Sequence, residues 1–189
     1  MKNKELQLEN LFKEMLQDKK LPFSSNLVFA EGSAEAEVVF IGEAPGAKED
    51  ELLKPFVGRS GKLLTESLKE ISLERNDVYI TNIVKRRPPD NRDPNLQEIA
   101  AYKPYLDRQL AIIKPKIIVT LGRFALNYFL PAEKITQAQG KVFLVANLKI
   151  LVMFHPAAAL RRKKLKEEFK NSFKVLQKLL ADKKKTISK

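Results

Sequence analysis

The chain has 189 residues, of which 44% are hydrophobic, and this suits one domain with a full hydrophobic core. It contains no cysteine and one histidine, which excludes disulfides and thiol catalysis and argues against a structural zinc site. The net charge of +12 favours a polyanionic partner, and nucleic acid is the obvious one. No apolar run is long enough for a membrane span, and the first residues are typical of an amphipathic helix. We therefore expect no membrane partner and a cytoplasmic location, close to the nucleoid in a prokaryote.

The first half of the chain alternates between helical periodicity and short apolar, β-branched runs. In chain order it predicts a helix over 4–18, a loop over 21–36, a strand over 37–41, an irregular segment over 46–58, a helix over 60–71 and a strand over 78–82. Prolines at 88, 89 and 94 exclude regular structure over 85–94.

The second half continues the alternation. It predicts a helix over 95–113, a strand over 116–121, a helix over 122–130, a short hairpin strand over 142–145, a core strand over 149–153 and a basic helix over about 157–181. Strands that alternate with helices indicate an α/β fold, here a three-layer α/β/α sandwich with a central, mostly parallel sheet of about four strands. The chain has no internal repeat and no clear linker, so we expect a single domain over 1–189.

Three chemically dense segments lie at the ends of predicted strands: GEAPG at 42–46, Thr81-Asn82, and HPA at 155–157. Because parallel strands end at the same edge of a sheet, these segments are expected to lie together, where open α/β folds build their sites. The only histidine of the chain, His155, would then lie beside acids and an amide, which is typical of an enzyme.

Two acids follow the first strand, Glu43 at once and Glu49 six residues later, with Asp50 behind them. Acids placed close together can have different pKa values, so that one serves as a base that orients water. A helix N-cap is the competing interpretation for Glu49 and Asp50, and it is the stronger for Asp50.

Phe56 and Asn82 have the chemistry to recognise a planar ring. Phe56 lies in a polar Pro-Phe-Val-Gly loop, where it either covers the core or stacks on a ligand; near an amide and a histidine we favour stacking. The Asn82 carboxamide offers a donor and an acceptor in one plane, which matches the N3–H and O4 edge of uracil and is the reverse of the cytosine edge. The structural alternative is an Asn that caps the loop backbone.

Two basic segments lie next to these residues. The stiff run over 85–92 suits contact with phosphates through Lys85, Arg86, Arg87 and Arg92. After His155, Arg161 and Arg162 are also expected to bind phosphate, and Leu160 or Arg161 could insert into a base stack. A solvated loop and a solvated helix are the ordinary alternatives.

Together these segments resemble the uracil-DNA glycosylase superfamily, specifically its family 4, the iron–sulfur type of bacteria and archaea. The motifs that carry the resemblance read here GEAPGAKED, PFVGRSG, TNIVKRRPPDNRDP and HPAAALR, and they extend from about residue 33 to residue 161. Four motifs in the same order and at the same intervals are a specific signal.

The resemblance implies a role for each matching position. It implies that the acids help to position and activate water, that the Ala44 backbone lines the pocket, that Phe56 stacks on the base, that Asn82 reads uracil and that His155 contacts the O2 side of uracil. It also implies that Arg161 belongs to a loop that inserts into DNA. The predicted catalytic residues are Glu43, Glu49 and His155.

The chain departs from the resembling family at the cluster. The iron–sulfur cluster implied there needs four cysteines; two would fall near Phe23 to Leu27, and the others align with Arg86 and Tyr102. We therefore expect no cofactor and no metal. Apolar packing is expected to hold this region instead, through Leu21, Phe23, Leu27 and Tyr102.

The sequence thus predicts a monofunctional DNA glycosylase that hydrolyses the N-glycosidic bond of uracil in DNA, as in base excision repair. Its partner would be uracil-containing DNA, single- or double-stranded, and we expect a monomer. The alternatives are a non-catalytic DNA-binding relative of the same superfamily and a nucleotide-binding hydrolase. The chain lacks the Gly-Lys-Ser/Thr motif that binds phosphate in P-loop proteins, which argues against the nucleotide-binding hydrolase.

Overall fold

A computed structural model describes residues 2–186, and its centre is a six-stranded sheet. The strands are β1 (Glu31–Gly32), β2 (Val38–Gly42), β3 (Tyr79–Asn82), β4 (Ile117–Leu121), β5 (Val142–Val145) and β6 (Leu148–Met153). Their order is β1-β3-β2-β4-β6-β5, and the four inner strands are parallel to one another. The edge strands β1 and β5 are antiparallel to their neighbours. The four parallel strands confirm the predicted core, and β1 is an addition within the segment expected to be a loop.

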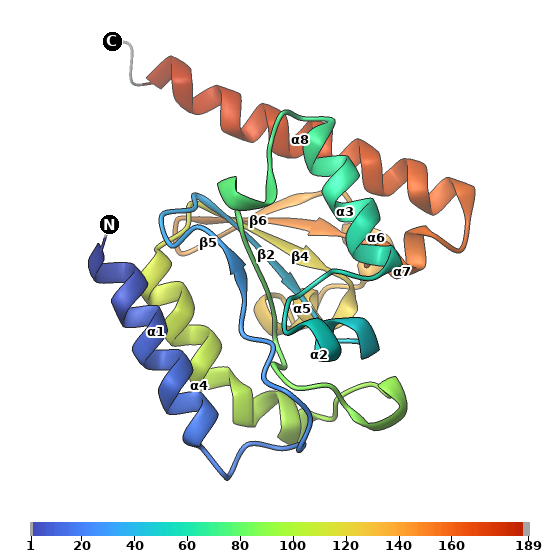
Figure 1. Cartoon of the computed structure of the whole chain (residues 1–189). Helices are drawn as coiled ribbons and strands as arrows, with labels where there is room; N and C mark the ends of the chain where they lie inside the picture. The colour runs from blue at the N-terminus through green and yellow to red at the C-terminus, as the bar shows by residue number, and fades with distance from the viewer. Residues whose placement is uncertain (1, 187–189) are drawn as a thin grey trace.

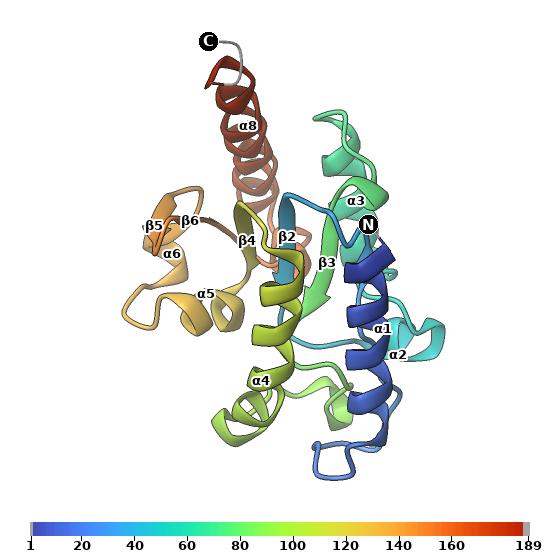
Figure 2. The same cartoon turned by 90° about the vertical axis from the view of Figure 1, so that its left-hand side faces the viewer.

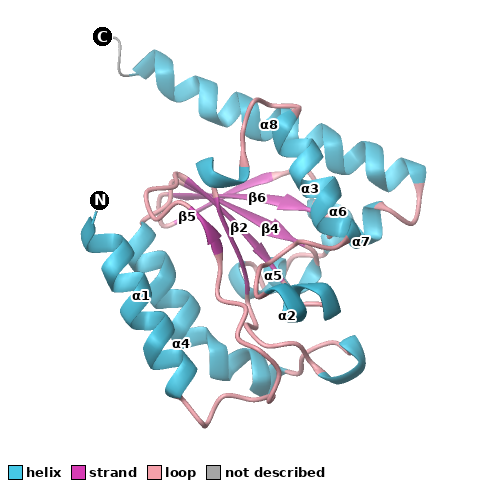
Figure 3. Cartoon of the chain, viewed as in Figure 1, coloured by secondary structure: helices cyan, strands magenta, loops and turns pink. Residues whose placement is uncertain are grey.

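Helices cover both faces of this sheet, so the predicted three layers are confirmed (Figures 1 and 3). The α-helices of the described residues are α1 (Lys2–Gln17), α2 (Ala47–Leu52), α3 (Arg59–Lys69), α4 (Leu96–Ile113), α5 (Arg123–Phe129), α6 (Ile135–Ala138), α7 (Pro156–Ala159) and α8 (Lys163–Thr186). Two short 3-10 helices, η1 (Arg75–Asp77) and η2 (Pro89–Asn91), lie between them. Among residues 2–186, no helix has the length and apolar content that a membrane crossing requires.

Alternate residues of each strand point to opposite layers. In β2, Phe40 packs with residues of α3 and α8, whereas Val39 and Ile41 pack with residues of α1, α4 and α5. The view in Figure 2 shows α1 and α4 in front of the strands. Because β2 and β4 are completely buried and Thr120 is their only polar side chain, the sheet is a rigid base for the segments that follow its strand ends.

The basic helix expected over 157–181 is in fact two helices, α7 and α8, joined by a turn at Leu160–Arg162. α7 contacts α3, whereas α8 crosses the sheet and buries Phe169 and Phe173. The chain must change direction between the two packing sites. No proline or glycine marks the turn, so helical periodicity could not reveal it.

Candidate active site

The register of the sheet brings the three predicted segments together. Gly42 at the end of β2 pairs with Asn82 at the end of β3, and Leu121 of β4 pairs with Met153 of β6. A cavity of about 390 Å³ lies beyond these ends. Eight predicted site residues line it: Glu43, Ala44, Glu49, Phe56, Asn82, Arg92, His155 and Arg161.

Phe56 and Asn82 both pack against Gly42. A Cβ at Gly42 would lie 2.4 Å from Asn82 Oδ1 and 2.5 Å from Phe56 Cζ, so a larger residue would displace both side chains. The Phe56 ring also lies 5.6 Å from the His155 ring, measured between centroids. A phenyl, a carboxamide and an imidazole therefore share one cavity wall.

Asn82 has an unsatisfied polar atom. Its side chain is buried, and Oδ1 has no hydrogen-bond partner in the described part of the chain. An unpaired buried acceptor costs about 1–3 kcal/mol, so its retention calls for an explanation. The predicted alternative, an Asn whose side chain caps the loop, gives no partner for this oxygen. A ligand N–H in the cavity would provide one.

His155 is the N-cap of α7, and its Nδ1 accepts a hydrogen bond from the Ala157 N–H at 3.2 Å. Burial lowers the pKa of His155 to about 4, and the charge of Glu49 opposes this shift. The imidazole is therefore neutral at ordinary pH, and its proton is on Nε2, because Nδ1 is an acceptor. Nε2–H is left as a donor at the cavity.

Glu43 follows β2 directly and is partly buried at the cavity wall. Burial raises the pKa of Glu43 to about 7; the nearby Asp93 carboxylate adds to the shift, and Arg123 opposes it. A carboxyl group with a pKa near neutrality can take up or release a proton under physiological conditions, which suits a general base.

Glu49 supports the loop that carries Phe56. Its Oε1 accepts hydrogen bonds from the Val57 N–H at 2.9 Å and the Gly58 N–H at 2.8 Å. The cap interpretation for Asp50 is wrong, because α2 begins at Ala47 and its N-cap residue is Gly46, with no side-chain cap. Asp50 Oδ1 instead accepts a hydrogen bond from the Asn26 N–H at 2.8 Å and ties α2 to the N-terminal loop.

The prediction that Lys85 contacts phosphate is wrong, because its side chain is fully buried. Its Nζ donates to Thr81 Oγ1 and to the Asn82 carbonyl, both at 2.6 Å. Burial lowers the pKa of Lys85 well below its ordinary value. The run of basic letters gives the charge but not the direction of each side chain, and the strand end turns this one inward.

The three predicted phosphate-binding arginines near Lys85 differ in exposure and in hydrogen-bond partners. Arg86 is partly buried and donates to the Ser25 carbonyl, and Arg87 donates to Asn91 Oδ1 at 2.8 Å. Arg92 is exposed at the cavity and pairs with Glu98. Arg87 and Arg92 thus reach the surface, where Asn91 and Glu98 hold them, whereas Arg86 is bound to the loop over 23–27.

Leu160, Arg161 and Arg162 are exposed at the turn between α7 and α8. Leu160 and Arg161 line a groove of about 470 Å³ next to the cavity, together with Lys48 and Arg59, which sequence reasoning missed. Ser60 and Asn91 are further cavity residues that it missed. Only their place in the sequence pointed to them: Ser60 belongs to the PFVGRSG motif, and Asn91 belongs to the proline-rich run over 85–94.

The residues at the four cluster positions do not fit an iron–sulfur cluster, because none carries a thiol. Within the described residues there is also no cluster of three or more His, Asp or Glu that could hold a metal. Leu21, Leu27 and Tyr102 are buried in one core cluster with Phe23 packed against it, which confirms the predicted apolar packing.

Hydrogen bonds add to this packing. Tyr102 Oη donates to the Pro22 carbonyl at 2.6 Å, and Arg86 donates to the Ser25 carbonyl. Arg86 and Tyr102, two of the four positions at which the resemblance implies cluster cysteines, therefore both hold the loop over 22–25. We call Arg86, Tyr102 and these two carbonyls the loop latch.

The fold and the cavity define an α/β protein with a polar cavity at the carboxyl ends of its parallel strands, lined by Phe56, Asn82 and His155. Residues 29–179 match the family model of the Uracil DNA glycosylase superfamily, so the chain belongs to that superfamily.

Three relatives are similar over most of the chain, and each is named Type-4 uracil-DNA glycosylase. The protein of Archaeoglobus fulgidus is 42% identical and covers 95% of this chain and 96% of its own length. That of Sulfurisphaera tokodaii is 46% identical over 91% of this chain and 84% of its own length. That of Saccharolobus solfataricus is 46% identical over 85% and 79%.

Proposed function

We propose that the chain is a uracil-DNA glycosylase that hydrolyses the N-glycosidic bond of uracil in DNA and leaves an abasic site. The observation that carries this proposal is the unpartnered Asn82 oxygen in a cavity shared with Phe56 and His155. Uracil N3–H would satisfy that oxygen, and the amide N–H would face O4. Cytosine would leave both groups unpaired, which a buried site rejects strongly.

The base must first leave the duplex, which costs a few kcal/mol and least at a mispair. Phe56 then stacks on the flipped ring. As the glycosidic bond breaks, the electron pair moves to the base and negative charge develops on O2. The neutral His155 donates from Nε2–H to that oxygen, which is the kind of preorganised donor that stabilises a transition state.

Glu43 is the better candidate for the acid that orients water. Its pKa of about 7 allows it to act as a base, whereas Oε1 of Glu49 is already taken by two backbone N–H groups. The water adds to the sugar carbon, and its proton passes to the Glu43 carboxylate. Glu49 would act on the reaction mainly through the Phe56 loop.

Among the described residues no lysine lines the cavity, which supports a monofunctional hydrolase that uses water instead of an amine nucleophile. Arg161 and Arg162 are exposed at the α7–α8 turn, and the whole chain has a net charge of +12. Both features support DNA as the substrate. We propose that the reaction needs no resident metal or cluster.

A labelled oligonucleotide with one uracil tests the proposal. We expect strand breaks at the uracil only after alkaline treatment, the same rate in a metal chelator, and none on a thymine control. Asn82→Ala should abolish most of the excision. DNA binding without strand breaks would identify a non-catalytic relative, and loss of activity with chelator would contradict a metal-independent reaction.

A further inference from the structure

Phe56, the phenyl of the cavity wall, has an unusual backbone. Its φ is +52°, in the left-handed region that bulky L-residues rarely adopt. Such a conformation persists only where surrounding contacts determine it strongly. The carbonyl groups of Pro55 and Phe56 and the N–H groups of the next two residues all have partners, so contacts on both sides fix the peptide planes around this residue.

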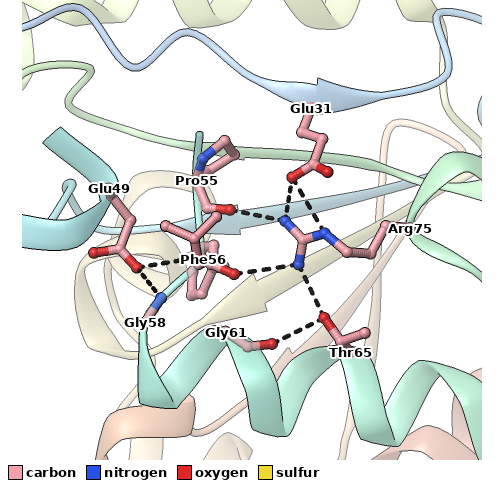
Figure 4. Close-up of polar contacts among 9 residues, drawn as sticks. Glu31, Glu49, Pro55, Phe56, Gly58, Gly61, Thr65 and Arg75 are labelled. Carbon is pink, nitrogen blue, oxygen red and sulfur yellow. Dashed lines mark hydrogen bonds and ion pairs between the residues drawn. The ribbon is translucent and has the colours of Figure 1, made fainter. Parts of the chain in front are cut away.

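Arg75 fixes the carbonyl side. This residue begins η1, on the opposite side of Phe56 from Glu49, and its guanidinium reaches both carbonyls (Figure 4). Nη2 donates to the Pro55 carbonyl at 2.8 Å, and Nη1 donates to the Phe56 carbonyl at 3.3 Å. Glu49 accepts hydrogen bonds from the N–H groups of Val57 and Gly58, so the loop that carries Phe56 is held on both sides of this residue.

Two side chains hold the guanidinium itself. Glu31 of β1 accepts from Nε at 3.2 Å and also from Nη2, and the pair is largely shielded from solvent. Thr65 Oγ1 of α3 accepts a hydrogen bond from Nη1 at 3.2 Å, and its hydroxyl donates a hydrogen bond to the Gly61 carbonyl at 3.0 Å. All five N–H groups of Arg75 are therefore used, in the planar geometry that only arginine offers.

The close fit extends to α3. A Cβ at Gly61 would lie 1.7 Å from the Phe56 carbonyl oxygen, so this glycine makes room for the oxygen that Arg75 binds. Arg75 itself does not line the cavity. Its influence on a bound base can only be exerted through the loop.

We propose that Arg75, held by Glu31 and Thr65, is a positioning residue that sets the orientation of the Phe56 ring and, through it, the rate of base excision. This role rests on the proposed function, because the rate concerns uracil. The ring orientation does not depend on activity and can be measured separately.

A double-mutant cycle tests the effect on rate. We expect Arg75→Lys to slow single-turnover excision about tenfold, since misplacement of a positioned group by an ångström can cost up to about 100-fold. DNA affinity should stay within about twofold, because Arg75 does not line the cavity or the neighbouring groove. In a Phe56→Ala background the same substitution should have no further effect on the rate, because the ring through which it acts is gone.

Proton NMR tests the orientation. His155 is the only histidine, and its ring lies 5.6 Å from that of Phe56, so its two carbon-bound ring protons report the phenyl ring current in a resolved part of the spectrum. Arg75→Lys should shift these resonances in the direction seen for Phe56→Ala. Thr65→Val, which keeps the shape and removes one hydrogen bond, should give a smaller shift of the same sign.

Arg108→Lys is the matched control. Arg108 also forms two hydrogen bonds with a glutamate, Glu14, at 2.5 and 2.7 Å, but this ion pair is more exposed and joins α4 to α1 away from the cavity. Its substitution should leave both the rate and the His155 resonances unchanged.

The outcomes separate the two proposals. Unshifted His155 resonances in both Arg75→Lys and Thr65→Val would overturn the positioning role, and so would equal slowing by Arg75→Lys with and without the Phe56 ring. A wild-type protein that fails to excise uracil would refute the proposed function and the effect on rate. Shifted resonances in that same protein would still establish Arg75 as the residue that sets the ring.

Discussion

Glu43 and His155 both have pKa values shifted toward the neutral form, because partial burial disfavours charge on either group. The pKa of Glu43 is raised to about 7, and that of His155 is lowered to about 4. Between these values the imidazole is neutral, and the carboxyl group changes its charge as pH rises. The pH dependence of the reaction should therefore report Glu43 alone.

We predict that single-turnover excision rises with pH and levels off above about pH 8, with an apparent pKa near 7. The carboxylate is the active form, so activity is lost as pH falls through the raised pKa. Glu43→Gln should be slow and should lack this dependence. The measurement uses excess enzyme over pH 5.5–8.5, and a wild-type rate that is flat across that range would contradict Glu43 as the base.

The raised pKa of Glu43 affects the stability of the protein in the opposite direction from its effect on the rate. The folded protein holds the Glu43 proton more tightly than the unfolded chain, so the Glu43 contribution to the free energy of unfolding should decline as pH rises from about 4.5 through about 7. The lowered pKa of His155 contributes a change of the opposite sign below about pH 6.5, in the wild type and in a Glu43 variant alike. Glu43→Gln should remove this decline, which urea unfolding at pH 5 and pH 8 would detect.

His155→Ala is predicted to slow single-turnover excision about 100-fold, the usual effect of removing one preorganised donor, with little change in DNA affinity. The donor acts on charge that develops only in the transition state, so binding of the uncleaved strand should not need it. Equal losses of rate and affinity would indicate a structural histidine instead.

The positions of the site residues could be predicted from the sequence better than the directions of their side chains. The strand-end positions of Glu43, Asn82 and His155 follow from apolar runs and the rule for parallel sheets, and the structure brings them into one cavity. The inward direction of Lys85 follows from its hydrogen bonds to Thr81 and to the Asn82 carbonyl at the end of β3, which the run of basic residues does not reveal. Arg75 was missed because it acts on the backbone of another segment, and carbonyl acceptors leave no trace in side-chain patterns.

At the scale of elements, the loop latch occupies the place that the resembling family gives to a metal cluster. Tyr102 is fully buried, and its hydroxyl holds the Pro22 carbonyl. We predict that Tyr102→Phe lowers the free energy of unfolding by about 1 kcal/mol, the net value of one hydrogen bond. Tyr102→Ala should cost about 3–5 kcal/mol, because it also leaves a cavity.

Urea unfolding of the two variants measures these values, and Leu96→Ala is the control. Leu96 lies on the same helix and is 84% exposed, so its substitution should change stability by less than about 0.5 kcal/mol. A Tyr102→Ala protein as stable as the control would show that the latch does not hold this region.

The elements themselves were predicted where hydrophobic periodicity is strong. Apart from Leu148 and Lys149 at the start of β6, the residues of the four inner strands are buried and mostly apolar, so these strands could be predicted from the sequence. β1 has two residues, Glu31 and Gly32, and pairs with β3 only because the chain passes along that edge. The break between α7 and α8 arises from packing against α3, which local sequence does not record.

At the scale of the whole molecule, the charge of +12 predicts that DNA binding weakens strongly with salt. The exposed Arg161 and Arg162 are expected to contribute two phosphate contacts beside the cavity. We predict that the double variant Arg161→Ala/Arg162→Ala reduces the slope of log affinity against log salt by about 2, since each contact to B-DNA contributes about 0.9.

The charge-matched control is Lys13→Ala/Arg108→Ala. These two residues belong to α1 and α4, on the other face of the sheet from α8 (Figure 1). Their removal should leave the slope unchanged. Equal reductions in the two double variants would mean that net charge, and not the α7–α8 turn, attracts DNA.

We propose that one cavity reads the edge of an extruded uracil through Asn82. The most direct test of this claim is the single-turnover excision rate of uracil and of cytosine, from otherwise identical strands, by the wild type and by Asn82→Asp. We predict fast uracil and undetectable cytosine excision by the wild type, and for Asn82→Asp a loss of about 100-fold on uracil with new activity on cytosine. Unchanged uracil excision by Asn82→Asp would contradict the claim.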